Sequence, residues 1–263
     1  MFATINGINL AYTDQGRGTP VVLLHAFPQS RAMWAPQVNA LSKTHRVIAP
    51  DFRGFGDSDA PEGAYTLDRF ADDVAELLDH LAIPRAVLVG LSMGGYTLFA
   101  FYRKHAARVN GLVLADTRAQ ADTEEGRAGR FAMAQTAKSK GAGAIADLML
   151  PKLLSPVAQQ TKPDLVRQVR SAIERTTVSG IVGALMAMAE RPDSVPLLAQ
   201  IACPVLVLTG ESDGPTPPAD GNFMAERIPG ARLEIIPQAG HLSNLEQPEA
   251  FNAAVRTFLD AIR

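Results

Sequence analysis

Ser92 stands in a sequence context that suits a catalytic nucleophile. It is the centre of Gly90-x-Ser92-x-Gly94, which follows the apolar run 86–89 and precedes a helix-compatible segment, 97–105. This is the spacing of a nucleophile elbow, a sharp turn between a strand and a helix that exposes a serine hydroxyl. Glycines are needed beside the serine because side chains there would collide with the neighbouring strand and helix. The pattern predicts that Ser92 attacks an electrophilic carbon.

Asp213 and His241 are the residue types that such a serine needs. A histidine can take the hydroxyl proton near neutral pH, and a carboxylate holds the histidine in the right tautomer. Each follows a predicted strand, 204–209 or 232–236. Because parallel strands end at a shared edge of a sheet, the three side chains can converge there. Asp116 also follows a predicted strand and is a rival acid, but we favour Asp213 because His241 follows it after one helix and one strand.

The elements that must position these side chains alternate between strand and helix. The Asn6-Gly7 pair predicts a hairpin between two edge strands. Further strands are predicted at 21–24, 46–50, 86–89, 109–115, 204–209 and 232–236, and helices at 31–42, 67–81, 97–105, 219–228 and 248–262. This order indicates an α/β fold with a mostly parallel, doubly wound sheet and helices on both faces.

Residues 118–198 differ from the rest of the chain because they contain no strand-like run. Helices are predicted there at 124–140, 142–150, 163–176 and 179–189. We therefore expect a core domain formed by residues 1–117 and 199–263, and a helical cap subdomain, 118–198, inserted after the sixth strand. Apolar cap side chains are expected to line part of a substrate pocket. The expected pocket residues are His25, Trp34, Met133, Met149, Met186 and Leu242. For His25 we favour a second role, holding the loop after strand 21–24 by hydrogen bonds, and Trp34 can equally belong to the core.

Composition limits the classes of protein that this chain can be. It has 263 residues, of which 47% are hydrophobic and 20% charged, so a large core is expected. The formal net charge is −2 and no basic face is evident, which argues against a nucleic-acid or membrane partner. The single cysteine, Cys203, excludes an intrachain disulfide. No residue cluster has metal-ligand spacing and no glycine loop resembles a phosphate or dinucleotide site, so we expect neither a metal nor a cofactor.

The first residues and the hydropathy pattern bear on location. Residues 1–7 lack a charged segment followed by an apolar one, and no apolar run reaches membrane-spanning length. We expect a cytoplasmic protein, either a monomer or a homodimer, whose partner is a small-molecule ester.

Five segments in order resemble the α/β-hydrolase-fold serine carboxylesterases. They are His25-Ala26-Phe27-Pro28, 51–58, 90–95, 210–213 and Gly240-His241. The resemblance is to the branch near the 3-oxoadipate enol-lactonases and cofactor-free haloperoxidases, and segments 115–119 and 188–194 resemble its esterases in particular.

The resemblance implies an α/β-hydrolase fold and a catalytic triad of Ser92, Asp213 and His241. It also implies an oxyanion hole made by the backbone N–H groups of Phe27 and Met93. The family commonly has glycine where this chain has Ala26, and alanine cannot adopt a glycine-only conformation without strain. The geometry of this loop is therefore a point on which the chain could depart from the family.

These expectations lead to a serine carboxylesterase that hydrolyses small, short-acyl esters through an acyl-enzyme on Ser92. Two other readings stay open. One is an enol-lactonase or C–C bond hydrolase, with perhydrolysis as a possible side activity. Substrates of those hydrolases carry carboxylates, and the arginines available to bind them are Arg118, Arg127, Arg130 and Arg191. The other is a ligand-binding protein of the same fold without catalysis.

Overall fold

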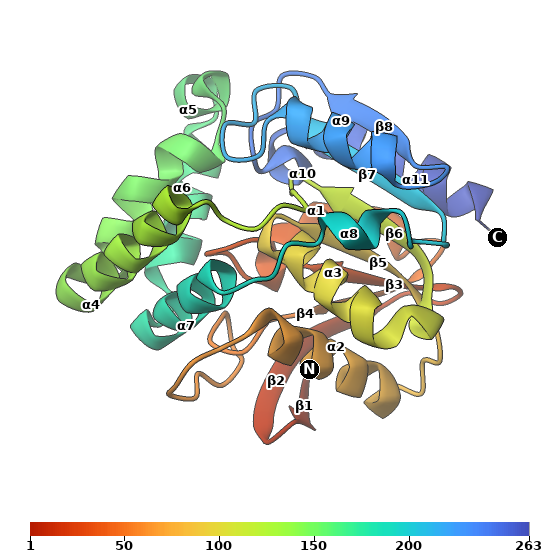
Figure 1. Cartoon of the computed structure of the whole chain (residues 1–263), viewed down its shortest axis with the longest axis horizontal. Helices are drawn as coiled ribbons and strands as arrows, with labels where there is room; N and C mark the ends of the chain where they lie inside the picture. Colours follow the sequence, from red (N-terminus) through yellow and green to blue (C-terminus); the bar gives the residue numbers. More distant parts are fainter. Residues whose placement is uncertain (263) are drawn as a thin grey trace.

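An eight-stranded sheet forms the centre of the molecule (Figure 1). The computed structural model describes residues 1–262. The strand order is β1-β2-β4-β3-β5-β6-β7-β8, with β1, β2 and β4 paired antiparallel and all later pairs parallel. The strands are β1 (Phe2–Ile5), β2 (Ile8–Gln15), β3 (Pro20–Leu24), β4 (Arg46–Pro50), β5 (Ala86–Leu91), β6 (Val109–Ala115), β7 (Val205–Gly210) and β8 (Arg232–Ile236).

The antiparallel edge is the hairpin that the Asn-Gly pair predicts. Asn6 and Gly7 have φ values of 46° and 79°, so both central residues of the turn are left-handed. Such turns match the twist of the flanking strands. The turn thereby sets the register in which Ile5 pairs with Ile8.

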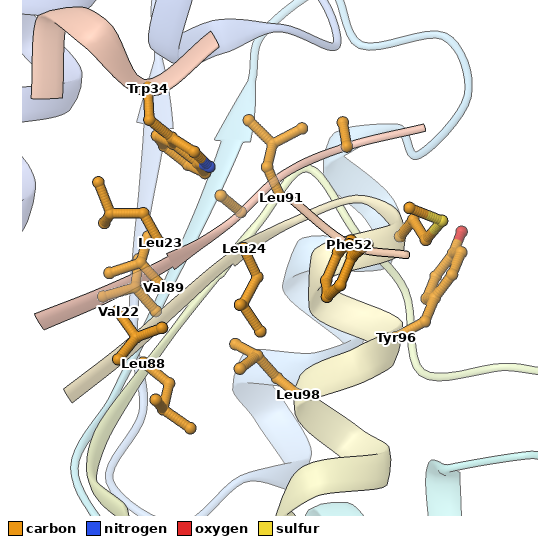
Figure 2. Close-up of a cluster of buried hydrophobic side chains, with 14 of the residues drawn as sticks. Val22, Leu23, Leu24, Trp34, Phe52, Leu88, Val89, Leu91, Tyr96 and Leu98 are labelled. Carbon is orange, nitrogen blue, oxygen red and sulfur yellow. The ribbon is translucent and has the colours of Figure 1, made fainter. Parts of the chain in front are cut away.

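Helices cover both faces of the sheet. On one face α1 (Ala35–Leu41) packs against α11 (Pro248–Ala261), and the Trp34 and Phe251 rings lie 5.9 Å apart. Helices α2 (Leu67–His80) and α3 (Met93–His105) pack together on the other face. Figure 2 shows Trp34 on one side of the central strands and Leu98 of α3 on the other. Helix α9 (Pro218–Arg227) packs against β7 and β8, and the 3-10 turn η2 (Ala106–Arg108) follows α3. The short α10 (Ser243–Glu246) and the 3-10 turn η1 (Arg31–Trp34) pack with α1 on the first face.

The central parallel strands are buried on both faces, which explains their uninterrupted apolar runs. Every residue of β5 and β7 is buried. A strand with only one covered face would alternate apolar and polar residues instead. The predicted doubly wound, mostly parallel sheet is confirmed.

The segment between β6 and β7 forms α4 (Glu124–Leu153), α5 (Pro156–Thr161), α6 (Pro163–Glu174), α7 (Val178–Ala189) and α8 (Val195–Leu198). Helices α4–α7, called the insertion here, gather on the left of Figure 1, and α4 packs against both α6 and α7. Helix α4 breaks at Gly141, whose φ of 77° and ψ of −177° are not helical. The two helices predicted on either side of residue 141 therefore exist. The cap boundaries at 118 and 198 stay a prediction.

Three features of the helices differ from expectation. Helices α5 and α8 have six and four residues, too few to show an apolar period in the sequence. Helix α3 begins at Met93 rather than at residue 97, since Gly94 and Gly95 have low helix propensity and hide its first turn. The predicted helix 31–42 is a 3-10 turn followed by α1. Among residues 1–262, no helix has the length and hydropathy needed to cross a membrane.

Candidate active site

Ser92 lies at a strained turn between β5 and α3. Its φ of 55° and ψ of −111° are unfavourable for a residue with a side chain. The Ser92 N–H donates to the Ala115 carbonyl at 2.9 Å, and the Thr117 hydroxyl donates to the Ser92 carbonyl at 2.9 Å. The end of β6 thus holds the turn that exposes the serine hydroxyl.

The glycines of the elbow permit close backbone contacts. A Cβ on Gly94 would lie 2.2 Å from the Leu24 carbonyl oxygen, and one on Gly90 would lie 2.5 Å from the Gly94 carbonyl carbon. Either substitution would force α3 away from the sheet. Helix α3 can therefore begin directly after Ser92 and against the end of β3 only because these positions lack side chains.

His241 connects Ser92 to Asp213. Its Nε2 lies 2.9 Å from Ser92 Oγ, and its Nδ1 lies 3.0 and 2.9 Å from the two Asp213 oxygens. With Nδ1–H donating to the carboxylate, Nε2 is free to accept the serine proton. The loops after β5, β7 and β8 thus bring these three predicted residues into the geometry of a nucleophile, a base and an acid.

Thr216 also holds the Asp213 carboxylate, and its hydroxyl oxygen lies 3.3 Å from His241 Nδ1. Its N–H donates to Asp213 Oδ1 at 3.0 Å, and its hydroxyl donates to Oδ2 at 2.7 Å. Burial acts to raise the Asp213 pKa. The charge of His241, its hydrogen bond and the two hydrogen bonds from Thr216 outweigh burial and hold the Asp213 pKa below its usual range. The sequence analysis does not name Thr216 as a site residue. Its signal would have been Asp213 itself, because an aspartate in a turn commonly accepts a hydrogen bond from a backbone N–H a few residues later.

Asp116, the rival acid, has other partners. One of its oxygens accepts the Gly210 N–H at 2.7 Å, and the other accepts the Ser243 hydroxyl. It is fully buried, and burial, followed by the nearby Asp213 charge, raises its pKa well above the ordinary value. Asp116 thus joins the end of β7 to the start of α10, which follows the His241 loop.

Of the two residues expected to supply oxyanion-stabilising N–H groups, Met93 directly follows Ser92 and Phe27 lines the cavity. Met93 is the first residue of α3, where N–H groups have no acceptor within the helix. Phe27 lines the cavity beside Ser92. Ala26 is not among the positive-φ residues of the described chain, so this loop does not need the glycine that relatives commonly have.

His25 forms two hydrogen bonds that hold the loop containing Phe27. Its Nδ1 donates to the Ala26 carbonyl at 2.9 Å, and its Nε2 accepts the Phe52 N–H at 3.1 Å. Both bonds need the neutral imidazole, because a proton on Nε2 would face another donor. Complete burial lowers the His25 pKa to about 4.

A cavity of about 140 Å³ opens at Ser92 and His241. Of the expected pocket residues, Met149 lines it, whereas His25, Trp34 and Leu242 are fully buried and Met133 and Met186 lie elsewhere in the insertion. The other lining residues are Phe27, Tyr96, Arg118, Asp122, Arg130, Met188, Pro215 and Thr216. A larger groove of about 430 Å³, between β2, η1 and the end of α6, contains none of the three reacting residues, so its size alone does not mark it as the active site.

Charged side chains form one wall of the cavity. Arg130 and Arg191 both pair with Asp122, with Arg191 at 2.7 Å. Arg118 pairs with Asp220 at 3.0 Å, and its Nε is buried without a partner. Of these charged side chains Arg118, Arg130 and Asp122 line the cavity, so two arginines face one carboxylate there and the wall has a positive balance. Within residues 1–262 no group of three or more His, Cys, Asp or Glu side chains is placed to hold a metal ion.

Comparisons with known proteins agree with this geometry. Residues 19–248 match the family model described as alpha/beta hydrolase fold. The chain is 32% identical to 3-oxoadipate enol-lactonase 2 of Acinetobacter baylyi over 252 residues, which is 96% of this chain and 92% of that protein. It superposes on a malate-bound thermophilic esterase from Thermogutta terrifontis with a TM-score of 0.97, at 41% identity over 100% of this chain and 98% of the other. For the enol-lactonase from Burkholderia xenovorans the TM-score is 0.93, at 35% identity over 99% and 100%.

Proposed function

Because the chain belongs to the alpha/beta-hydrolase family, we propose that it is a serine carboxylesterase acting on small, short-acyl esters. The observation that supports this most strongly is the continuous hydrogen-bonded path from Ser92 Oγ through His241 to Asp213. A serine hydroxyl is a weak nucleophile until a base removes its proton, and this path supplies the base and its orienting acid.

The proposed reaction has two halves. His241 takes the Ser92 proton, the serine oxygen attacks the ester carbonyl, and the oxyanion is stabilised by the N–H groups of Met93 and Phe27. Protonated His241, stabilised by Asp213, then gives its proton to the departing alcohol. In the second half His241 takes a proton from water, whose oxygen attacks the acyl-enzyme carbonyl. Protonated His241 then returns this proton to Ser92 Oγ as the bond to the acyl group breaks, which releases the carboxylic acid and the free serine.

The cavity supports a preference for short acyl groups. Its volume of about 140 Å³ is small, and Phe27, Met149 and Met188 supply apolar contacts. A long acyl chain would have to displace part of the insertion. We therefore expect acetyl and propionyl esters to be hydrolysed with higher kcat/KM than octanoyl esters.

Turnover of a short-chain aryl ester tests the proposal. We expect Ser92→Ala to lower kcat/KM by at least about 10³-fold, because the acyl-enzyme can no longer form. Ser139→Ala, which changes an exposed serine on α4, is the matched control and should behave as the wild type. A wild-type protein without turnover, or a fully active Ser92→Ala variant, would exclude this mechanism.

The positive wall favours a second candidate, a lactonase for lactones that carry a carboxylate. Arg118 lines the cavity and its Nε–H has no protein partner, so this group can donate to an anionic substrate group. Two similar proteins are also named enol-lactonases. If this candidate is right, a carboxylated lactone should have higher kcat/KM than neutral esters, and Arg118→Met should abolish that preference. Arg127→Met is the control and should keep the preference, because Arg127 pairs with Glu190 and does not line the cavity.

A further inference from the structure

Glu246 is a fully buried carboxylate that the reaction itself does not use. Its oxygens accept the Ser155 hydroxyl at 2.5 Å, the Ser155 N–H at 3.2 Å and the Gly240 N–H at 3.0 Å. Ser155 lies between α4 and α5 of the insertion, whereas Gly240 immediately precedes His241. One side chain therefore bonds both the insertion and the loop of the catalytic base.

A second contact joins the same two segments on the other side of His241. The Leu242 N–H donates to the Leu153 carbonyl at 3.0 Å. The residues before and after His241 are thus each connected to the insertion, one through Glu246 and one directly. We call Leu153, Ser155, Gly240, Leu242 and Glu246 the seam.

The seam is closely packed. A Cβ on Gly240 would lie 2.5 Å from the Ser155 backbone nitrogen and 2.9 Å from Glu246 Oε1. Lys162, which follows α5, also donates to the Glu246 main-chain carbonyl. Little displacement of the insertion is possible here without breaking a bond that holds the His241 loop.

We propose that Glu246 is a positioning residue that fixes His241 relative to the insertion, so that the base and the end of α4 move as one unit. All the groups around the carboxylate are donors, which suits an acceptor-only carboxylate and leaves no place for an amide NH₂ without losing a bond. Burial raises the Glu246 pKa, and the three donors oppose this effect. The inference rests on the proposed function, in which His241 is the base.

Hydrogen exchange and kinetics of Glu246→Gln test this role. We expect amide exchange to accelerate together in segments 153–158 and 239–246, by about tenfold, since a hydrogen bond to a charged acceptor is lost. We also expect kcat for a short-acyl ester, and the rate of Ser92 phosphonylation, to fall by about tenfold while KM changes less, because the base is displaced rather than the pocket. Glu249→Gln, an exposed neighbour at the start of α11, is the matched control and should change neither quantity.

Gly240→Ala provides a second variant that keeps the Glu246 carboxylate. Its added Cβ would collide with the Ser155 backbone and push the two sides of the seam apart. It should produce the same paired exchange and loss of kcat, so the proposal remains testable if Glu246→Gln does not fold. Exchange that accelerates in only one of the two segments, or two variants with the kcat of the Glu249→Gln control, would overturn the proposal. Wild-type protein that neither hydrolyses esters nor reacts with the phosphonate would instead contradict the proposed function, while the exchange result would still report on the seam.

Discussion

The Asp213 carboxylate depends on Thr216 as well as on His241. Replacing Thr216 by Val keeps the side-chain shape and removes the donor at 2.7 Å from Oδ2. A hydrogen bond to a charged group contributes about 1.5–3 kcal/mol, so we expect kcat/KM to fall by about tenfold or more. Steady-state kinetics with a short-acyl ester measures this effect.

Thr216→Ser is the control for this prediction because it retains the hydroxyl. Its kcat/KM should stay within about threefold of the wild type, given that only a methyl group is lost. Equal activity of the Val and Ser variants would show that the hydroxyl does not support the acid.

At the scale of single residues, the sequence identifies the site residues that directly follow strands. It misses site residues such as Thr216 that contact them only because of the shape of a loop. Ser92, Asp213 and His241 each follow a predicted strand, and parallel strands must bring them to one edge. Thr216 contacts Asp213 through the shape of a short loop. Trp34 is fully buried in the core. The sequence leaves it open between core and pocket wall, because an aromatic side chain on a short helix has no sequence feature that separates the two.

Gly141 is the element-scale feature that shapes the insertion. Its backbone angles lie in a region that is essentially restricted to glycine, and a Cβ there would meet no atom within 4 Å. Gly141→Ala should therefore destabilise the protein by about 1–3 kcal/mol through backbone strain alone. Chemical denaturation measures the change.

Gly143 offers a matched comparison two residues later in the same helix. It also has open space around its Cα but no positive φ. Gly143→Ala should stabilise the protein by up to about 1 kcal/mol, since alanine is the better helix former. If both alanine variants are stabilised, the break in α4 at residue 141 is not a fixed feature.

Elements with long apolar faces could be predicted from the sequence, and short or glycine-containing ones could not. The sequence predicts a helix at 67–81, because apolar residues recur along one face, and α2 spans Leu67–His80. Helix α8 is too short for such a pattern. The early start of α3 follows from its contact with Leu24, a tertiary effect that overrides the low helix propensity of two glycines.

For the whole molecule, His25 makes stability depend on pH. Its folded pKa is about 4, below the ordinary value of 6.5, because it is completely buried. As pH falls from 6.5 towards 4 the unfolded chain takes up a proton that the folded protein excludes, so stability falls with pH in this window. From these pKa values we expect a loss of about 2 kcal/mol between pH 7 and pH 5.

Denaturation of the wild type and of His25→Asn at both pH values isolates this contribution. The variant is expected to be less stable at pH 7, because it loses the packing of the ring against Phe52 and Phe55. Its stability should change less between the two pH values. The same pH dependence in both proteins would mean that His25 is not the group responsible.

The central claim is that Ser92 is a nucleophile activated by His241, and covalent labelling by an organophosphonate tests it most directly. Mass spectrometry of the intact protein and of its peptides should show one phosphonyl adduct, located on Ser92, with loss of esterase activity in proportion to labelling. Ser92→Ala should not be labelled, and His241→Gln should be labelled at least about 10³-fold more slowly, because the base no longer takes the serine proton. Absence of an adduct on Ser92 in folded wild-type protein, or labelling of His241→Gln at the wild-type rate, would contradict the account.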